Sequence, residues 1–245
     1  MPSALIDLVL PRECAGCGRP DSSWCTVCRD ALAEPPEAVR PRVSIGSPCW
    51  ALGPYGGPGR GAIVAAKERG RRDLAVPLGA ALAGAIDWLR SEGEIDPPEL
   101  SPLILVPAPS RRRAARRRGG DPVTRFCRAA AVVLRPEPVR VAPVLRLDAA
   151  ARDSVGLSAA QRADNLRGRI RVDGRARSDR DGWPGRAGWS GRDGWPGGCA
   201  KWCDQGQVIL VDDVVTTGTT AAESVAALNR FGVTVAAVLV IAAVR

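Results

Sequence analysis

The sequence predicts an α/β protein whose mostly parallel sheet is flanked by helices, preceded by a small module with four cysteines. Near the C-terminus, an apolar run at 208–211, a helical stretch and a second apolar run at 233–244 follow one another as strand, crossover helix and strand. That order is typical of a parallel sheet covered on both faces. Hydrophobic residues make up 45% of the 245 residues, which suffices for a sizeable buried core.

The remaining elements follow from periodicity and from Gly and Pro. Apolar residues recur at helical spacing within 51–98, where Pro77 stands near a helix start. Residues 100–110 form a short apolar run closed by prolines, which indicates a buried strand ending in a rigid loop. We expect further helices over 122–134, 157–168 and 221–232, and further strands over 138–147, 169–172, 208–213 and 233–244.

The chain divides into two predicted units. Residues 1–50 are expected to form the four-Cys module, and residues 51–245 the larger domain. Within the larger domain, residues 178–205 contain three successive hexapeptides, RDGWPG, RAGWSG and RDGWPG. Their density of Gly and Pro opposes both helix and sheet, so this low-complexity Gly/Trp/Arg stretch is predicted to be a flexible insertion between two strands.

Composition limits the chemistry. The sequence has no histidine, which removes the commonest general base and the commonest nitrogen ligand for metals. Any metal site must therefore use cysteine or carboxylate. The net charge is +9 and nearly all basic residues are arginine, which favours phosphorylated ligands or nucleic acid as partners. A GC-rich genome that encodes Arg in place of Lys would produce the same excess.

The lack of a visible targeting signal predicts a cytoplasmic protein. No secretory signal is visible, and the longest apolar stretch, 233–244, is too short to cross a bilayer. We therefore expect no membrane insertion. In a reducing compartment, paired cysteines suggest a metal before a disulfide.

The segment after the predicted strand at 208–211 carries the strongest functional signal. Asp212 and Asp213 are expected at the carboxyl end of that strand, where ligands bind in open α/β sheets. The turn Thr216, Thr217, Gly218, Thr219 and Thr220 follows, and Thr220 with Glu223 fits a capping box that opens a helix. Such a turn presents backbone N–H groups and a positive helix end to an anion. An ordinary strand–turn–helix is the alternative interpretation.

The N-terminal module has the spacing of a metal site. Cys14 and Cys17 form one CxxC pair, Cys25 and Cys28 form another, and seven residues separate the pairs. Four thiolates at this spacing suit tetrahedral Zn²⁺, which would stabilise a segment too short to have its own core. Cys49 is either a spare thiol or a substitute ligand. Cys199 and Cys203 lie in the insertion.

The segment VILVDDVVTTGTT, residues 208–220, resembles the phosphoribosyl pyrophosphate (PRPP) motif of type I phosphoribosyltransferases. The resemblance implies that fold, with Asp212 and Asp213 holding the ribose hydroxyls and the loop Thr216–Thr220 holding the 5′-phosphate. It also implies Mg²⁺ bridging the pyrophosphate and the ribose.

The whole layout resembles the ComF family, in which a four-Cys, zinc-ribbon-like module is joined to such a domain. Three further segments support this resemblance: AAKERGRRDLAVPLG, LVPAPSRRRAARRRGGD and LSAAQRADNLRG, the last through Leu157, Ser158, Arg162, Asn165 and Leu166. The family usually continues its Arg-rich loop with an aromatic residue, whereas Gly119, Gly120 and Asp121 follow here. The repeats at 178–205 are also foreign to the pattern.

Pyrophosphate is expected at the loop after the Pro-rich strand, where phosphoribosyltransferases hold it. The candidates are Ala108, Pro109, Ser110 and Arg111, with Arg112 and Arg113 close behind. Lys67 is either a further phosphate contact or a surface lysine. Six of the eight residues from Arg111 to Arg118 are arginine, which suits a clamp over pyrophosphate, a contact with a nucleic-acid backbone, or a solvated loop.

The resemblance leaves two accounts of function open. In the first, the protein binds Mg·PRPP and transfers the phosphoribosyl group to a nitrogen nucleophile that the sequence does not identify. In the second, it is a non-catalytic module for competence and DNA uptake that binds single-stranded DNA or DNA-processing proteins. Trp183, Trp189 and Trp195 in the repeats would then stack on bases, although simple repeat slippage also explains them.

Overall fold

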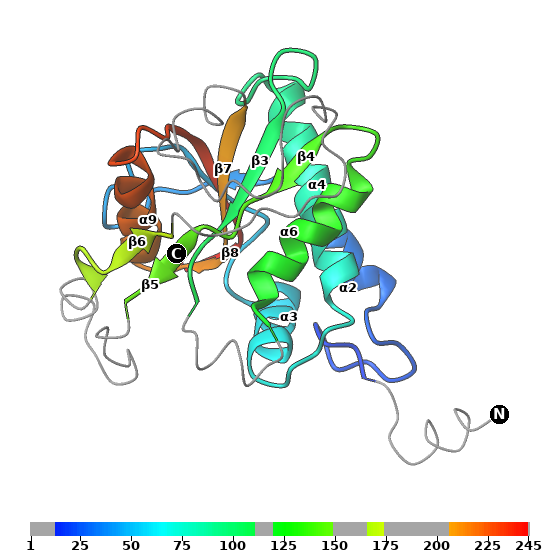
Figure 1. Ribbon diagram of the computed structural model, residues 1–245. Coiled ribbons are helices and arrows are strands. Elements are labelled where there is room, and N and C mark those ends of the chain that lie inside the picture. The colour runs from blue at the N-terminus through cyan, green and yellow to red at the C-terminus, as the bar shows by residue number, and fades with distance from the viewer. Residues whose placement is uncertain (1–12, 111–119, 149–165, 174–205, 245) are drawn as a thin grey trace.

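A computed structural model describes residues 13–110, 120–148, 166–173 and 206–244. It is an α/β structure with a six-stranded sheet in the order β1-β2-β8-β7-β3-β4 and a two-stranded sheet of β5 and β6 (Figure 1). The strands are β1 (Glu37–Ala38), β2 (Cys49–Ala51), β3 (Leu103–Pro107), β4 (Val139–Val141), β5 (Leu145–Leu147), β6 (Ile170–Val172), β7 (Gln207–Val215) and β8 (Val235–Ala243). The helices are α2 (Thr26–Asp30), α3 (Gly57–Lys67), α4 (Ala75–Ser91), α6 (Pro122–Val133) and α9 (Thr219–Asn229).

The large sheet is mostly parallel, as the sequence predicted. Strands β2, β8, β7, β3 and β4 all run in the same direction, and only β1 pairs in the antiparallel sense. The central strand β7 is continuously apolar and buried over Val208–Val211. Such runs are typical of parallel strands that are covered on both faces.

The two crossovers beside the sheet centre run in opposite directions. From β3 the chain passes through α6 to β4, whereas from β7 it passes through α9 to β8 on the other side. Helices α3, α4 and α6 cover one face of the sheet, and α9 covers the other with the β5–β6 pair (Figure 1). The carboxyl ends of β3 and β7 therefore flank a topological switch point, the usual ligand crevice of open α/β sheets.

Several element boundaries differ from the sequence prediction, including those of α9, which runs over Thr219–Asn229. The single strand expected over 138–147 is two strands in different sheets, β4 and β5. Pro143 lies between them, and because it lacks an N–H it cannot continue the hydrogen bonding of a strand. Strand β7 continues past the acids, and Val214 and Val215 pair with β8. The last strand begins at Val235, two residues later than expected. The greater part of the helix predicted over 157–168 lies outside the described residues.

The N-terminal segment packs closely on the larger domain. A Cβ added at Gly61 of α3 would lie 2.5 Å from the carbonyl oxygens of Ala15 and Gly16, so the helix backbone touches the turn between the first two cysteines. Arg71 donates to the carbonyl of Ser23 at 3.1 Å and to that of Glu13 at 3.3 Å. The sequence placed the end of the four-Cys module at residue 50, whereas β1 and β2 lie within the large sheet.

No helix in the described ranges combines the length and the apolar character needed to cross a membrane.

Substitutions at two glycines of α4 can test how closely this helix packs on α6. A Cβ at Gly79 would lie 2.4 Å from the Cβ of Ala129, whereas a Cβ at Gly84 would meet no atom within 4 Å. We expect Gly79→Ala to lower the free energy of unfolding by about 1–3 kcal/mol through overpacking. Gly84→Ala should raise it by about 0.4–1 kcal/mol, because it restricts the unfolded chain. Urea denaturation of both variants checks the pair, and a stabilising Gly79→Ala would contradict the close packing.

Candidate functional site

The two acids of the predicted ribose site lie within β7. Asp212 pairs in register with Val240 of β8, and the strand ends at Val215. Because side chains alternate along a strand, adjacent residues face opposite sides of the sheet. Asp213 faces the side covered by α3, and Asp212 faces the side covered by α9.

Asp213 is neutralised within the protein. Its side chain is 3% exposed, and its Oδ2 lies 2.5 Å from Nζ of Lys67 at the end of α3. The sequence leaves Lys67 as either a phosphate contact or a surface lysine. The structure brings it to one of the ribose candidates, and the ion pair offsets the cost of burying the carboxylate.

Among the described residues, no ion pair like that of Asp213 forms at Asp212. Its Oδ1 accepts a hydrogen bond of 2.8 Å from the backbone N–H of Asp213. Burial raises the pKa of Asp212 well above its usual value, the charge of Asp213 raises it further, and Lys67 lowers it only in part. Burial and the nearby Asp212 charge likewise raise the pKa of the Cys49 thiol to about 11. The α9 side of β7 is therefore an electronegative site that favours a cation or hydroxyl donors.

The threonine turn joins β7 to α9. Gly218 is the N-cap of α9 and has a φ of +88°, a left-handed conformation that glycine adopts without strain. The capping box predicted from Thr220 and Glu223 is wrong. The helix starts at Thr219 without a side-chain cap, and Glu223 instead accepts a hydrogen bond of 2.8 Å from the N–H of Gly168.

The backbone N–H groups of this turn are candidate donors for a ligand. Across the described part of the chain, no backbone carbonyl accepts from the N–H groups of Thr217, Gly218 or Thr219. The hydroxyls of Thr217 and Thr219 lie 3.0 Å apart. Thr216 is exposed, Thr217 and Thr220 are partly buried, and Gly218 and Thr219 are buried. Unpaired N–H groups at a helix N-terminus suit an anion.

A segment before β2 contacts the turn from one side, and this contact is not among those that the sequence predicts. Val43 donates its N–H to the carbonyl of Thr217 at 2.9 Å. A Cβ added at Gly218 would lie 2.7 Å from the Cβ of Pro41, so only glycine fits beneath this segment. No local pattern predicts such a contact, because it joins residues far apart in the chain.

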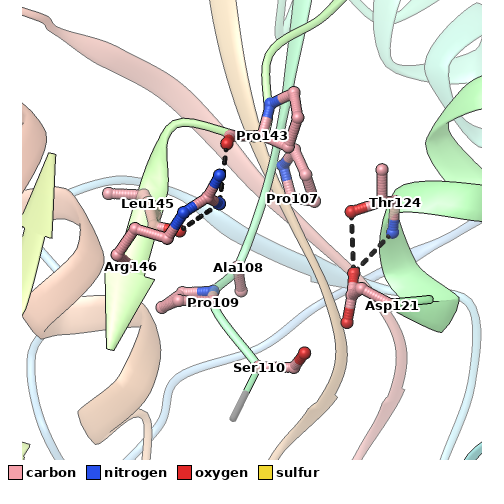
Figure 2. Close-up of a pocket in the computed structure, with 9 residues that line it drawn as sticks. All are labelled: Pro107, Ala108, Pro109, Ser110, Asp121, Thr124, Pro143, Leu145 and Arg146. Carbon is pink, nitrogen blue, oxygen red and sulfur yellow. Dashed lines mark hydrogen bonds between the residues drawn. The ribbon is translucent and has the colours of Figure 1, made fainter. Parts of the chain in front are cut away.

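The pyrophosphate candidates follow directly after β3, the strand that pairs with β7. Ala108 donates its N–H to the carbonyl of Val211 at 2.7 Å, which places it beside the acids. Ala108, Pro109 and Ser110 line a pocket of about 130 Å³ (Figure 2). The same pocket contains Asp121, a residue for which the sequence analysis proposed no role.

Several predicted contacts lie outside the described residues. These are Arg111, Arg112, Arg113 and the rest of the Arg-rich loop to Arg118, the repeats with Trp183, Trp189 and Trp195, and Cys199 and Cys203.

The four N-terminal cysteines come together as predicted. The Sγ atoms of Cys14, Cys17, Cys25 and Cys28 all lie within 4.8 Å of one another, and those of Cys17 and Cys25 are 3.7 Å apart. Zn–S bonds of about 2.3 Å would place tetrahedral ligands roughly 3.8 Å from each other. The cluster could therefore hold a structural metal such as zinc.

The backbone around the cysteines favours thiolate. Burial alone would raise the pKa of Cys14, but N–H donors from Cys25, Cys17 and Gly16 lower it to about 6. Burial and the neighbouring sulfurs raise the pKa of Cys28, so four thiolates this close need a cation. Cys49 is not part of this group, because it lies in β2 and packs in the core beneath α9.

Neutralising the two acids should change stability in opposite directions. A carboxyl whose pKa is raised by folding stabilises the fold below its unfolded pKa, and this contribution is lost as pH rises through the folded value. Asp212→Asn should therefore stabilise the protein, and more at pH 8 than at pH 4. Asp213→Asn should destabilise it by about 1–3 kcal/mol, because Lys67 loses its buried partner. Urea denaturation at both pH values measures this, and equal effects of the two variants would contradict the assignment.

Metal content tests the cysteine cluster. We expect elemental analysis to find about one zinc ion per chain. Cys25→Ser should lower both the zinc content and the melting temperature, whereas Cys49→Ala should leave the zinc content unchanged. Fully folded protein without metal, or zinc loss in the Cys49 variant, would contradict this role of the cluster.

No family model matches this chain, and a search of curated proteins finds no match.

Proposed function

We propose that the chain binds a magnesium complex of PRPP, or a related ribose phosphate, in the crevice between β3 and β7. The observation that carries this proposal is the threonine turn between β7 and α9. Its N–H groups have no backbone acceptor among the described residues, and the turn follows the strand that contains Asp212 and Asp213. A phosphate site and a diol site then stand side by side. The resemblance of residues 208–220 to the motif of type I phosphoribosyltransferases supports the same ligand.

The 5′-phosphate would bind at the turn. The amides of Thr217, Gly218 and Thr219 have no competing acceptor among the described residues, and α9 adds the positive end of its dipole. The rigid support from Pro41 and Val43 keeps the turn in place before the ligand arrives. A preformed site loses less entropy on binding.

The ribose hydroxyls and the magnesium ion would bind beside Asp212. This acid combines a raised pKa with no ion pair in the described structure, so an approaching cation or hydroxyl donor relieves an unfavourable charge. Asp213 already has Lys67 as its partner and would orient the site from the opposite face. The pair would then combine one partly buried carboxylate that meets the ligand and one internal ion pair.

We infer that the reaction, where catalysis occurs, transfers the phosphoribosyl group to a nitrogen nucleophile. The bond from C1 to nitrogen forms, the bond from C1 to the pyrophosphate oxygen breaks, and the nitrogen releases its proton to solvent. Positioning and charge stabilisation around the pyrophosphate perform most of this work. A chain without histidine is compatible with such chemistry. The Cys cluster would bind zinc in a ribbon-like module with a structural role.

The alternative, a competence module that binds single-stranded DNA, rests on the Arg-rich loop and the tryptophan repeats. Those residues lie outside the described part of the chain, and the proposal of a ribose-phosphate site does not depend on them.

Calorimetry with Mg·PRPP tests the proposed ligand. Wild-type protein should bind, and Asp212→Asn should weaken binding roughly tenfold or more, since a charged hydrogen bond contributes about 1.5–3 kcal/mol. Glu94→Gln removes an exposed carboxylate elsewhere and should leave the affinity unchanged. Absence of binding by wild type, or unchanged binding by a folded Asp212→Asn, would refute the ribose site. Pyrophosphate release across a panel of nitrogen nucleophiles then tests catalysis.

A further inference from the structure

A second pocket lies at the edge of the large sheet where β3 and β4 begin, opposite the edge that carries the threonine turn. The last turns of α4 and α6 line it, together with Pro98 and Glu99 before β3 and with Pro136 and Glu137 before β4. We call it the amino-edge pocket. Its volume of about 490 Å³ falls within the roughly 300–1,000 Å³ that is usual for pockets that receive organic groups.

The pocket and its rim expose apolar side chains. Val133 lines the pocket and is 51% exposed, and Leu134 lies beside it. Leu100, which is 77% exposed, stands directly after the lining segment that precedes β3. Pro98 and Pro136 add two further apolar rings. Apolar side chains that gather around a hollow are typical of a surface that receives another apolar group.

The same pocket is short of positive charge. Residues 87–99, which contribute to its lining, include five acidic residues and one basic residue, Arg90. Arg90 is already occupied, because its Nη1 donates to Oε2 of Glu137 at 2.6 Å and lies 3.7 Å from Oδ1 of Asp87. Burial raises the pKa of Asp87, Arg90 lowers it and the charge of Glu137 raises it again. The C-terminal ends of α4 and α6 add the negative ends of two helix dipoles.

A group that fits this pocket is therefore both apolar and cationic, and the repeats at 180–197 supply such groups. Each hexapeptide contains one arginine and one tryptophan. The central hexapeptide, RAGWSG, has no acidic residue to balance Arg186, and its tryptophan is Trp189. An indole ring buries a large apolar area, and a guanidinium group forms strong hydrogen bonds with carboxylates. The repeats lie outside the described ranges of the chain.

The chain returns from the repeats next to this pocket. A Cβ added at Gly206, the first described residue after them, would lie 2.6 Å from the carbonyl oxygen of Pro102. Gln207 donates its N–H to the same carbonyl at 2.8 Å, and its Oε1 accepts from the N–H of Asp96 at 3.0 Å. Asp96 and Pro102 bracket the segment that lines the pocket. The chain from Trp189 to Gly206 can extend over about 60 Å, so the pocket is within its reach.

We propose that the amino-edge pocket is the docking site of the chain's own repeats, with the indole of Trp189 against Val133 and the guanidinium of Arg186 beside the acids of residues 87–99. The tether makes docking favourable even where the contact itself is weak, because it gives the segment an effective concentration of roughly millimolar. A docked tryptophan is held at the edge opposite the ligand crevice and is withdrawn from stacking on bases. This inference does not rest on the proposed function.

Two exposed valines provide a matched pair of variants. Val133→Asp places a negative charge in the pocket, where it adds to the existing acids and opposes an indole. Val76→Asp places the same charge in the first turn of α4, outside the pocket lining, at a side chain that is 69% exposed. Thermal melts verify that both variants fold.

The first measurement records fluorine NMR spectra of the full chain labelled with fluorotryptophan, with resonances assigned by single Trp→Phe variants. In wild type and in Val76→Asp, the Trp189 resonance should lie away from its position in a synthetic peptide of residues 180–197. In Val133→Asp it should return to the position found in the peptide. A wild-type resonance at the peptide position, or one that Val133→Asp leaves unchanged, would overturn the docking.

The second measurement follows trypsin cleavage after Arg186, which reports the undocked population of the segment. Val133→Asp should be cut at least about fivefold faster than wild type, and Val76→Asp at the wild-type rate. Equal rates in the three chains would overturn the inference. Docking within one chain is independent of protein concentration, so cleavage that slows as the protein is concentrated would make a second copy the occupant and overturn the intramolecular contact. Neither measurement involves PRPP, so failure of the proposed ligand leaves this test unaffected.

Discussion

The parallel ladder between β3 and β7 is the constraint on which the rest of the structure depends. It pairs five residues of each strand, from Leu103 opposite Gln207 to Pro107 opposite Val211. The bond from the N–H of Ala108 to Val211 extends the ladder by one step. The described crossovers through α6 and α9 leave these strands in opposite directions, so neither helix crosses between their carboxyl ends. Shifting the register by one residue would separate the β3 pocket from the acids of β7.

The two sides of this crevice have opposite electrostatic character. The turn after β7 offers backbone N–H groups and a helix N-terminus, which attract anions. The pocket after β3 is lined by the Asp121 carboxylate and by three prolines, which have no N–H to donate to an anion. Asp212 lies in β7, and burial and the charge of Asp213 raise its pKa. Such an arrangement matches an anionic ligand that arrives with its own metal, because each end then meets a complementary surface.

Much of this could be predicted from local pattern. The apolar run Val208–Val211 identified the central strand because parallel strands exclude polar residues, and the CxxC spacing identified the cysteine cluster. The exact extent of β7 could not be predicted, because Val214 and Val215 are held by pairing with β8 and not by local preference. The capping box failed for a similar reason, since Glu223 finds Gly168, a distant partner. Asp121 could be recognised as a cap before Pro122, but its place in the pocket after β3 could not, because that pocket joins segments far apart in the chain.

Gly61 lies where the larger domain contacts the four-Cys module, two units that the sequence predicts separately. It lets α3 rest on the turn between Cys14 and Cys17, and the same helix ends at Lys67. Six residues of α-helix extend about 9 Å, so one helix connects the two sites over a short distance. The position of the Lys67 ammonium group beside Asp213 therefore depends on the packing of α3 against the cysteine cluster. A bulkier residue at position 61 would push the helix outward and move that positive charge away from the centre of the sheet.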